Sequence, residues 1–116
     1  NSQYLRCCKI AGIKSHPARF PQRLPEFFIE FLTDVGDVVL DIFAGSNTTG
    51  AAAEKLGRRW IAFEISRKYL ASSAFRFLDE FDEDKVRALF KGLSSSKVVE
   101  AVTIPQKVQL RLSVEE

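Results

Sequence analysis

Two groups of residues in this sequence have the types and the spacing that suit a nucleotide-like ligand. The first is Ala44-Gly45-Ser46, which carries almost no side-chain bulk and follows the apolar run Val38–Leu40. Backbone without bulky side chains allows a ligand to approach closely. A helix that begins directly after such a loop also presents N–H groups and the positive end of its dipole. The sequence therefore predicts a ligand-binding loop between a strand and a helix.

The second group is a single carboxylate, Glu64, near the end of the apolar run Trp60–Ile65. It lies about twenty residues beyond Gly45, and at a strand end a carboxylate with this spacing accepts hydrogen bonds from both hydroxyls of a ribose. The plainer alternative is an ordinary strand-turn-helix corner with an exposed carboxylate. A nicotinamide dinucleotide site is less well supported, because Gly45 and Gly50 do not give the Gly-x-Gly-x-x-Gly spacing that a pyrophosphate needs.

A strand, a helix and a second strand are expected to position these groups. We expect the strands over residues 38–42 and 60–65, both buried, because their side chains are apolar and often β-branched. The helix between them is expected over residues 48–56, with Thr48 or Thr49 as its N-terminal cap. The order predicts a βαβ unit with a right-handed crossover.

An amphipathic helix is predicted before the first strand. Its apolar residues recur at i, i+3, i+4, i+7 and i+8, which is the spacing of one helix face. We expect this apolar stripe to lie in a core rather than at a ligand site. The stripe consists of Leu24, Phe27, Phe28, Phe31 and Leu32.

The other segments are expected to complete one domain. Gly57 is placed to end the central helix of the βαβ unit. Ser66 is placed to begin another helix, and Asp82 or Asp84 a further one. Residues 108–114 alternate between apolar and polar side chains, which predicts an edge strand or hairpin. The remaining helices are expected over residues 1–10, 66–81 and 82–92, and a boundary is expected between residues 1–93 and 94–116.

The composition is that of a globular chain. Of its 116 residues, 46% are hydrophobic and 28% are charged, which indicates one small domain or part of one. The net charge of +2 permits an acidic partner such as DNA without arguing for one. The apolar runs are too short for a membrane span and no signal peptide is evident, so we expect a cytoplasmic protein. Because the chain begins with Asn1 rather than Met, a fragment or a processed piece is expected.

Neither the cysteines nor the histidine indicate a metal site. Cys7 and Cys8 are adjacent, which suits neither a zinc ribbon nor a disulfide framework, so we expect both thiols to be reduced. His16 is the single histidine and has no second metal-ligand residue spaced near it. It opens the segment His16–Pro21, whose two prolines favour an extended path. That segment is either a rigid connector or one wall of a ligand site.

Three blocks of the sequence together resemble a known family. They are His16–Pro21, Asp41–Thr49 and Gly57–Glu64, which are similar to motifs X, I and II of the amino DNA methyltransferases. These enzymes methylate the exocyclic N4 of cytosine or N6 of adenine. The order resembles the β-class arrangement, and the resemblance covers about residues 1 to 80. It implies an α/β, Rossmann-like class I methyltransferase fold, present in part, with residues 1–93 as its cofactor-binding portion.

The resemblance also implies a binding site for S-adenosyl-L-methionine. In this family motif I wraps the methionine part of the cofactor, and motif X closes over the methionine end. The acid of motif II holds the ribose hydroxyls, and the residue after it flanks the adenine. Matched residue by residue, the cofactor-binding set is His16, Pro17, Phe20, Asp41, Phe43, Ala44, Gly45, Ser46, Thr48, Glu64 and Ile65.

Two positions depart from the usual motif I, Asp-Pro-Phe-x-Gly-Ser-Gly-Thr-Thr. Ile42 stands in place of the proline, which is expected to loosen the turn slightly. Asn47 stands in place of a glycine, and asparagine is the next residue most tolerant of positive φ. We expect neither change to abolish binding.

The catalytic element of the family is missing from this chain. It is a Ser/Asp/Asn-Pro-Pro-aromatic tetrapeptide that holds the flipped base, whereas Pro17, Pro21, Pro25 and Pro105 are all separate. We therefore expect no catalytic residue here, and a catalytic and target-recognition half upstream or on a second polypeptide. Without that half, the chain is expected to expose a sheet edge and the apolar stripe, and to be stable only with its partner.

The resemblance implies a site-specific DNA methyltransferase that acts on double-stranded DNA by direct methyl transfer. We favour N4 of cytosine as the acceptor, in a restriction-modification system, because the sequence of residues 1–6 and 13–63 is most similar to the N4-cytosine members of the family. The alternatives are an N6-adenine methyltransferase segment and a non-catalytic, degenerate cofactor-binding module.

Overall fold

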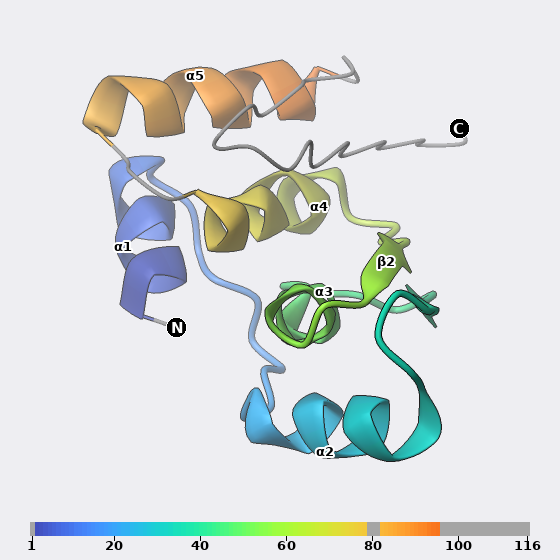
Figure 1. Cartoon of the computed structure of the whole chain (residues 1–116). Coiled ribbons are helices and arrows are strands. Elements are labelled where there is room, and N and C mark those ends of the chain that lie inside the picture. The colour runs from blue at the N-terminus through green and yellow to red at the C-terminus, as the bar shows by residue number, and fades with distance from the viewer. Residues whose placement is uncertain (1, 79–81, 96–116) are drawn as a thin grey trace.

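The computed structural model describes residues 2–78 and 82–95 (Figure 1). The predicted α/β class is confirmed, with two strands among the described elements. The expected strand or hairpin over residues 108–114 lies outside the described residues. None of the described helices is long and apolar enough to cross a membrane. The elements are α1 (Ser2–Ile10), α2 (Arg23–Leu32), β1 (Val38–Asp41), α3 (Thr48–Lys55), β2 (Arg59–Ala62), α4 (Arg67–Ser73), the 3₁₀ helix η1 (Ala74–Phe77) and α5 (Glu83–Ser94).

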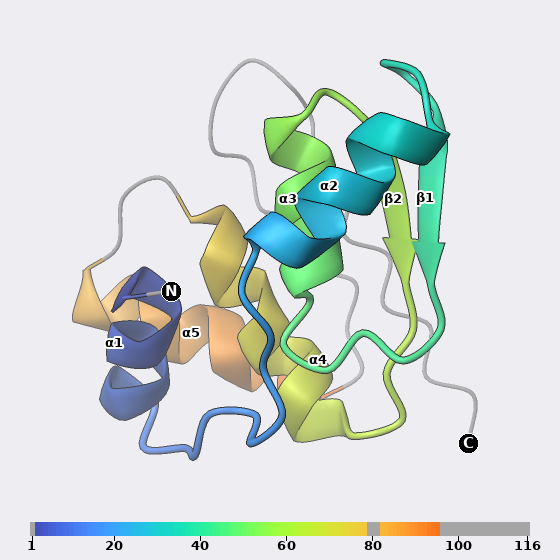
Figure 2. The same cartoon turned by 90° about the horizontal axis from the view of Figure 1, so that it is seen from below.

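The two strands pair in parallel, with α3 connecting them, as the βαβ prediction required (Figure 2). The register places Val38 opposite Arg59 and Asp41 opposite Ala62. Both strands are shorter than predicted, although backbone bonds continue beyond the ladder, from Phe63 N to Asp41 O at 2.9 Å. This extension holds the loop after β1 beside the segment after β2.

The strands are less buried than predicted. Along β1 and β2 the residues alternate between exposed and half-buried, and Val38, Leu40 and Ile61 are each about half exposed. Apolar β-branched runs of this kind are typical of strands that are covered on both faces. On one face of this small sheet, Val39 and Trp60 pack against the cluster of Ile29, Ala52 and Ala53, whereas the side chains of the other face stay partly exposed.

The cap of α3 differs from the prediction. Neither Thr48 nor Thr49 is the N-cap; Asn47 is, with a left-handed backbone (φ 60°) and a side chain that accepts a hydrogen bond from Gly50 N at 2.9 Å. A β-branched threonine adopts that conformation only at a high cost, whereas asparagine tolerates it. The other end of α3 follows the prediction, because Gly57 has φ 75° and donates to Glu54 O.

Replacing the cap residue is expected to destabilise the fold. Asn47→Ala removes the hydrogen bond to Gly50 N and places a Cβ-bearing residue without a local acceptor in left-handed backbone, which together cost about 2 kcal/mol. Asn47→Gly restores the backbone freedom and loses the cap bond alone, so its cost should be smaller, a few tenths of a kcal/mol. Urea unfolding of the complete enzyme measures both. Equal stability of Asn47→Ala and wild type would contradict the assignment of the cap.

Helix α2 packs on α3 by a different face from the one predicted. The buried residues of α2 are Pro25 and Ile29, and Ile29 contacts Ala52 and Ala53. The side chains of the predicted core stripe lie on the surface and are between 50% and 75% exposed. They are Leu24, Phe27, Phe28, Phe31 and Leu32. Placing this stripe in the core of the chain was therefore wrong. The expectation that the chain would expose it without a partner is confirmed.

A second core joins α1, η1 and α5. It is built from Tyr4, Cys7, Cys8, Phe75 and Val86, all nearly inaccessible. Both cysteines are free thiols, and burial raises the pKa of each above its ordinary value. This core supports α4 and η1, which lie between α5 and the βαβ unit (Figure 1).

The helix predicted over residues 66–81 is shorter. Ser66 caps it as expected, but α4 ends at Ser73 and continues as the 3₁₀ helix η1, which ends at Phe77. The side-chain amide of Gln3 donates to the carbonyls of Phe75 and Leu78. Carbonyls that a helix end leaves without a partner are thus satisfied by α1, so the helix can stop early.

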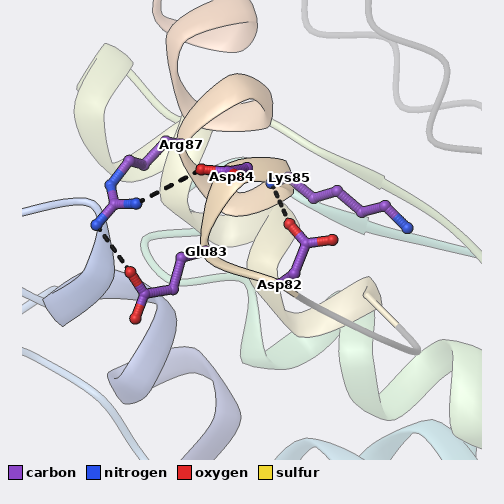
Figure 3. A network of polar contacts seen from close by, with 5 residues as sticks. All are labelled: Asp82, Glu83, Asp84, Lys85 and Arg87. Carbon is purple, nitrogen blue, oxygen red and sulfur yellow. Dashed lines mark hydrogen bonds and ion pairs between the residues drawn. The ribbon is translucent and has the colours of Figure 1, made fainter.

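Helix α5 begins at the expected acidic cap. The side chain of Asp82 accepts a hydrogen bond from Lys85 N at 2.8 Å, and Arg87 pairs with Glu83 at 3.0 Å and with Asp84 at 3.9 Å (Figure 3). These pairs are exposed and contribute little to stability. The helix ends at Ser94, close to the predicted end near Gly92, and its Leu93 is buried against Ala71 and Ala74.

Candidate cofactor-binding site

The loop between β1 and α3 is held in a fixed shape by its own hydrogen bonds and by one to the residue that follows β2. Asp41 Oδ1 accepts a hydrogen bond from Phe43 N at 2.9 Å. Ala44 N donates to Phe63 O at 2.9 Å, and Asn47 N donates to Ala44 O at 2.7 Å. The loop therefore lies at the carboxyl edge of the two parallel strands, where ligands bind in open α/β sheets.

Gly45 brings the segment around His16 against this loop. Its φ of 56° is in the left-handed region, and a Cβ at this position would lie 3.1 Å from His16 Nε2. Both the backbone conformation and the packing therefore require glycine. The predicted proximity of the His16–Pro21 segment and the loop is thus a feature of the structure (Figure 2).

His16 is held from three sides. Its backbone N donates to Tyr4 Oη at 3.1 Å, and its ring meets Tyr69 edge-on with the ring centroids 4.5 Å apart. Its Nδ1 lies 3.2 Å from Ala18 N. The following residues of the predicted set, Pro17 and Phe20, lie on the surface. The segment is therefore ordered at His16 and exposed beyond it.

Glu64 lies beside the loop, as the pairing of Ala44 with Phe63 requires. Its Oε2 accepts a hydrogen bond from Ser66 N at 3.3 Å, and the residue is half-buried. Two large apolar side chains flank this edge, with Phe43 84% exposed and Ile65 98% exposed. A carboxylate between exposed apolar groups fits a ligand that has a hydroxyl-bearing sugar and a flat apolar ring.

The side chains of Ser46 and Thr48 face the protein rather than solvent. Each residue is 3% exposed, and their hydroxyl oxygens lie 3.4 Å apart. Arg76 of η1 donates to both the carbonyl and the hydroxyl of Ser46. In this structure the side chains of Ser46 and Thr48 support the loop from within the protein.

Sequence reasoning missed Arg76 altogether. It lies thirty residues beyond Ser46, so no local pattern connects the two. One observation could have drawn attention to it. Arg76 is a charged residue between Phe75 and Phe77, in a segment that is otherwise apolar and packs against the rest of the domain.

Known proteins resemble this chain in sequence and in fold. The sequence profile of the DNA methylase family matches residues 2–75. Type II methyltransferase M.PvuII of Proteus hauseri is 50% identical over 105 residues, which are 90% of this chain and 31% of that protein. The structure of PvuII DNA methyltransferase (cytosine-N4-specific) superposes with a TM-score of 0.79 and 53% identity over 82% of this chain and 34% of that one.

A more distant structure shows the same fold. The complex of M1.HpyAVI with SAM gives a TM-score of 0.51 with 37% identity, covering 53% of this chain and 30% of that one. The chain thus spans about a third of the relatives it matches. The resemblance stated from the three motifs is confirmed, and so is the class I methyltransferase fold, present in part. Because the family profile matches residues 2–75 and the similar proteins are methyltransferases of the same fold, this chain belongs to the DNA methylase family.

Proposed function

We propose that this chain is the S-adenosylmethionine-binding segment of a site-specific DNA methyltransferase. One observation carries the proposal: the glycine loop braced by His16 lies beside the Glu64 carboxylate at the carboxyl edge of parallel strands. A relative of the same fold was solved in complex with SAM. The cofactor, when bound, supplies an electrophilic methyl group on a sulfonium centre.

Each part of the site has a proposed task toward the cofactor. Glu64 accepts hydrogen bonds from the ribose hydroxyls through the carboxylate that Ser66 N orients. Phe43 and Ile65 flank the adenine, which would cover two side chains that are otherwise exposed. The loop at Gly45 and the segment that begins at His16 enclose the methionine end.

Transfer of the methyl group to a DNA base requires a catalytic half that lies outside this chain. We propose that it covers the apolar stripe of α2 and an adjoining groove of about 350 Å³ between α2 and β1. The groove is lined by apolar side chains such as Phe28, Ile29 and Leu40. That half would supply the tetrapeptide that holds the flipped base and the contacts to double-stranded DNA. The cytoplasm and a restriction-modification system are the proposed setting.

N4 of cytosine is the proposed acceptor. This choice is supported by the 53% identity with an enzyme described as cytosine-N4-specific. N6 of adenine stays the alternative, because the tetrapeptide that would decide between the two acceptors is not in this chain. The third candidate, a non-catalytic module, would bind the cofactor or a protein without transferring the methyl group.

A labelled transfer assay separates these candidates. The chain and its catalytic half are incubated with double-stranded DNA and S-adenosylmethionine labelled on the methyl group, and the DNA is digested to nucleosides for mass spectrometry. We expect labelled N4-methylcytosine. Labelled N6-methyladenine would overturn the choice of acceptor. Binding of the cofactor without any transfer to DNA would favour the non-catalytic module.

A further inference from the structure

Arg76 contacts one residue of the cofactor loop through two donors. Its Nε donates to Ser46 O at 2.6 Å, and its Nη2 donates to Ser46 Oγ at 2.9 Å. The guanidinium also lies over the ring of Tyr4, 4.6 Å from the ring centroid. Burial lowers the pKa of Arg76, and an arginine remains a cation in proteins, so these are charge-assisted bonds in a partly desolvated place.

These bonds fix the plane of one peptide group in the loop. The carbonyl of Ser46 is held by Arg76, and the N–H on the opposite side of the same peptide, that of Asn47, is held by Ala44 O at 2.7 Å. Because a peptide bond is planar and trans, fixing both groups fixes the orientation of the whole unit. This matters here because Gly45 and Asn47, on either side of Ser46, both have left-handed backbone.

The same arginine is connected to the other wall of the site. Tyr4, which lies under the guanidinium, accepts the hydrogen bond from His16 N at 3.1 Å. The ring of His16 in turn packs against Gly45, next to Ser46. Together these contacts connect four parts of the chain in a ring: α1, the His16 segment, the loop and η1.

We propose that Arg76 is a positioning residue that sets the shape of the cofactor loop and its distance from the His16 segment. The inference rests on the proposed function, because the shape of the loop matters only if the loop holds S-adenosylmethionine. The planar guanidinium is essential to this role, because its two N–H donors reach two atoms of one residue, Ser46. A lysine at this position keeps the charge and loses the fork.

The test compares Arg76→Lys with Arg87→Lys in the complete enzyme. Arg87 is an exposed arginine on α5 with ion pairs of its own, so it controls for the chemical change. We expect Arg76→Lys to weaken binding of S-adenosylmethionine by about tenfold while kcat at saturating cofactor stays within about twofold. Arg87→Lys should bind as wild type does. Amide hydrogen exchange at Asn47 should be faster in the ligand-free Arg76→Lys enzyme, a readout that needs no cofactor.

A second variant keeps the inference testable if Arg76→Lys does not fold. Tyr4→Phe keeps the ring under the guanidinium and removes the acceptor for His16 N, so it should weaken cofactor binding by a few fold. Unchanged cofactor affinity in Arg76→Lys, or in Tyr4→Phe where the first variant cannot be purified, would overturn the inference, even if the melting temperature fell. Failure of the wild-type enzyme to bind S-adenosylmethionine would instead overturn the proposed function itself.

Discussion

Glu64→Ala is expected to weaken binding of S-adenosylmethionine by about a hundredfold. In the proposed site this carboxylate accepts hydrogen bonds from both ribose hydroxyls, and its orientation is set by the hydrogen bond from Ser66 N. Charge-assisted hydrogen bonds contribute about 1.5–3 kcal/mol each, so the loss of both gives at least the predicted factor. Calorimetric titration of the complete enzyme measures it.

Two further variants make this result specific. Glu64→Gln keeps the shape and loses the charge, so its loss should be intermediate. Glu83→Ala removes an exposed carboxylate on α5 and should leave binding unchanged. If Glu64→Ala bound the cofactor as tightly as Glu83→Ala, the ribose role of Glu64 would be wrong.

Phe31→Asp is expected to separate this chain from its catalytic half. Phe31 is 75% exposed, the most exposed side chain of the α2 stripe, and the proposed interface would bury it. An aspartate at that position would have to lose its water without a partner, which costs several kcal/mol, in addition to the lost apolar contact. Co-purification of the two halves, or sedimentation of a mixture, should show at least hundredfold weaker association.

Ala88→Asp is the matched control for this change. It places the same charge on an exposed position of α5, away from the stripe, and should leave association intact. The chain without its partner should bind a hydrophobic dye or self-associate, because large apolar patches are rarely stable in water. A compact monomer that unfolds cooperatively on its own would contradict the proposed interface.

The order and the type of the elements were predictable because they depend on local patterns. Apolar periodicity indicated the strands and α2. Gly57, which adopts a positive φ, marked the end of α3. The cap at Asn47 could have been predicted, because asparagine tolerates positive φ. The prediction of Thr48 or Thr49 was wrong because cap preferences alone do not show which residue has the left-handed backbone.

Burial was harder to predict than the elements themselves. Periodicity shows which face of α2 needs cover, whereas the cover for Phe31 and its neighbours is not among the described residues. The contacts of Arg76 depend on how distant segments pack, and no spacing within the sequence encodes them. The candidate site was therefore predicted through its motifs, and its supporting contacts required the structure.

The most direct test of the proposed site is a titration of the chain, together with its catalytic half, with S-adenosylmethionine and separately with NAD. The Glu64 carboxylate and the loop without dinucleotide glycine spacing predict saturable binding of one S-adenosylmethionine per chain and no binding of NAD. Binding of NAD, or binding of neither ligand, would contradict the proposal that this loop and Glu64 hold the methyl donor.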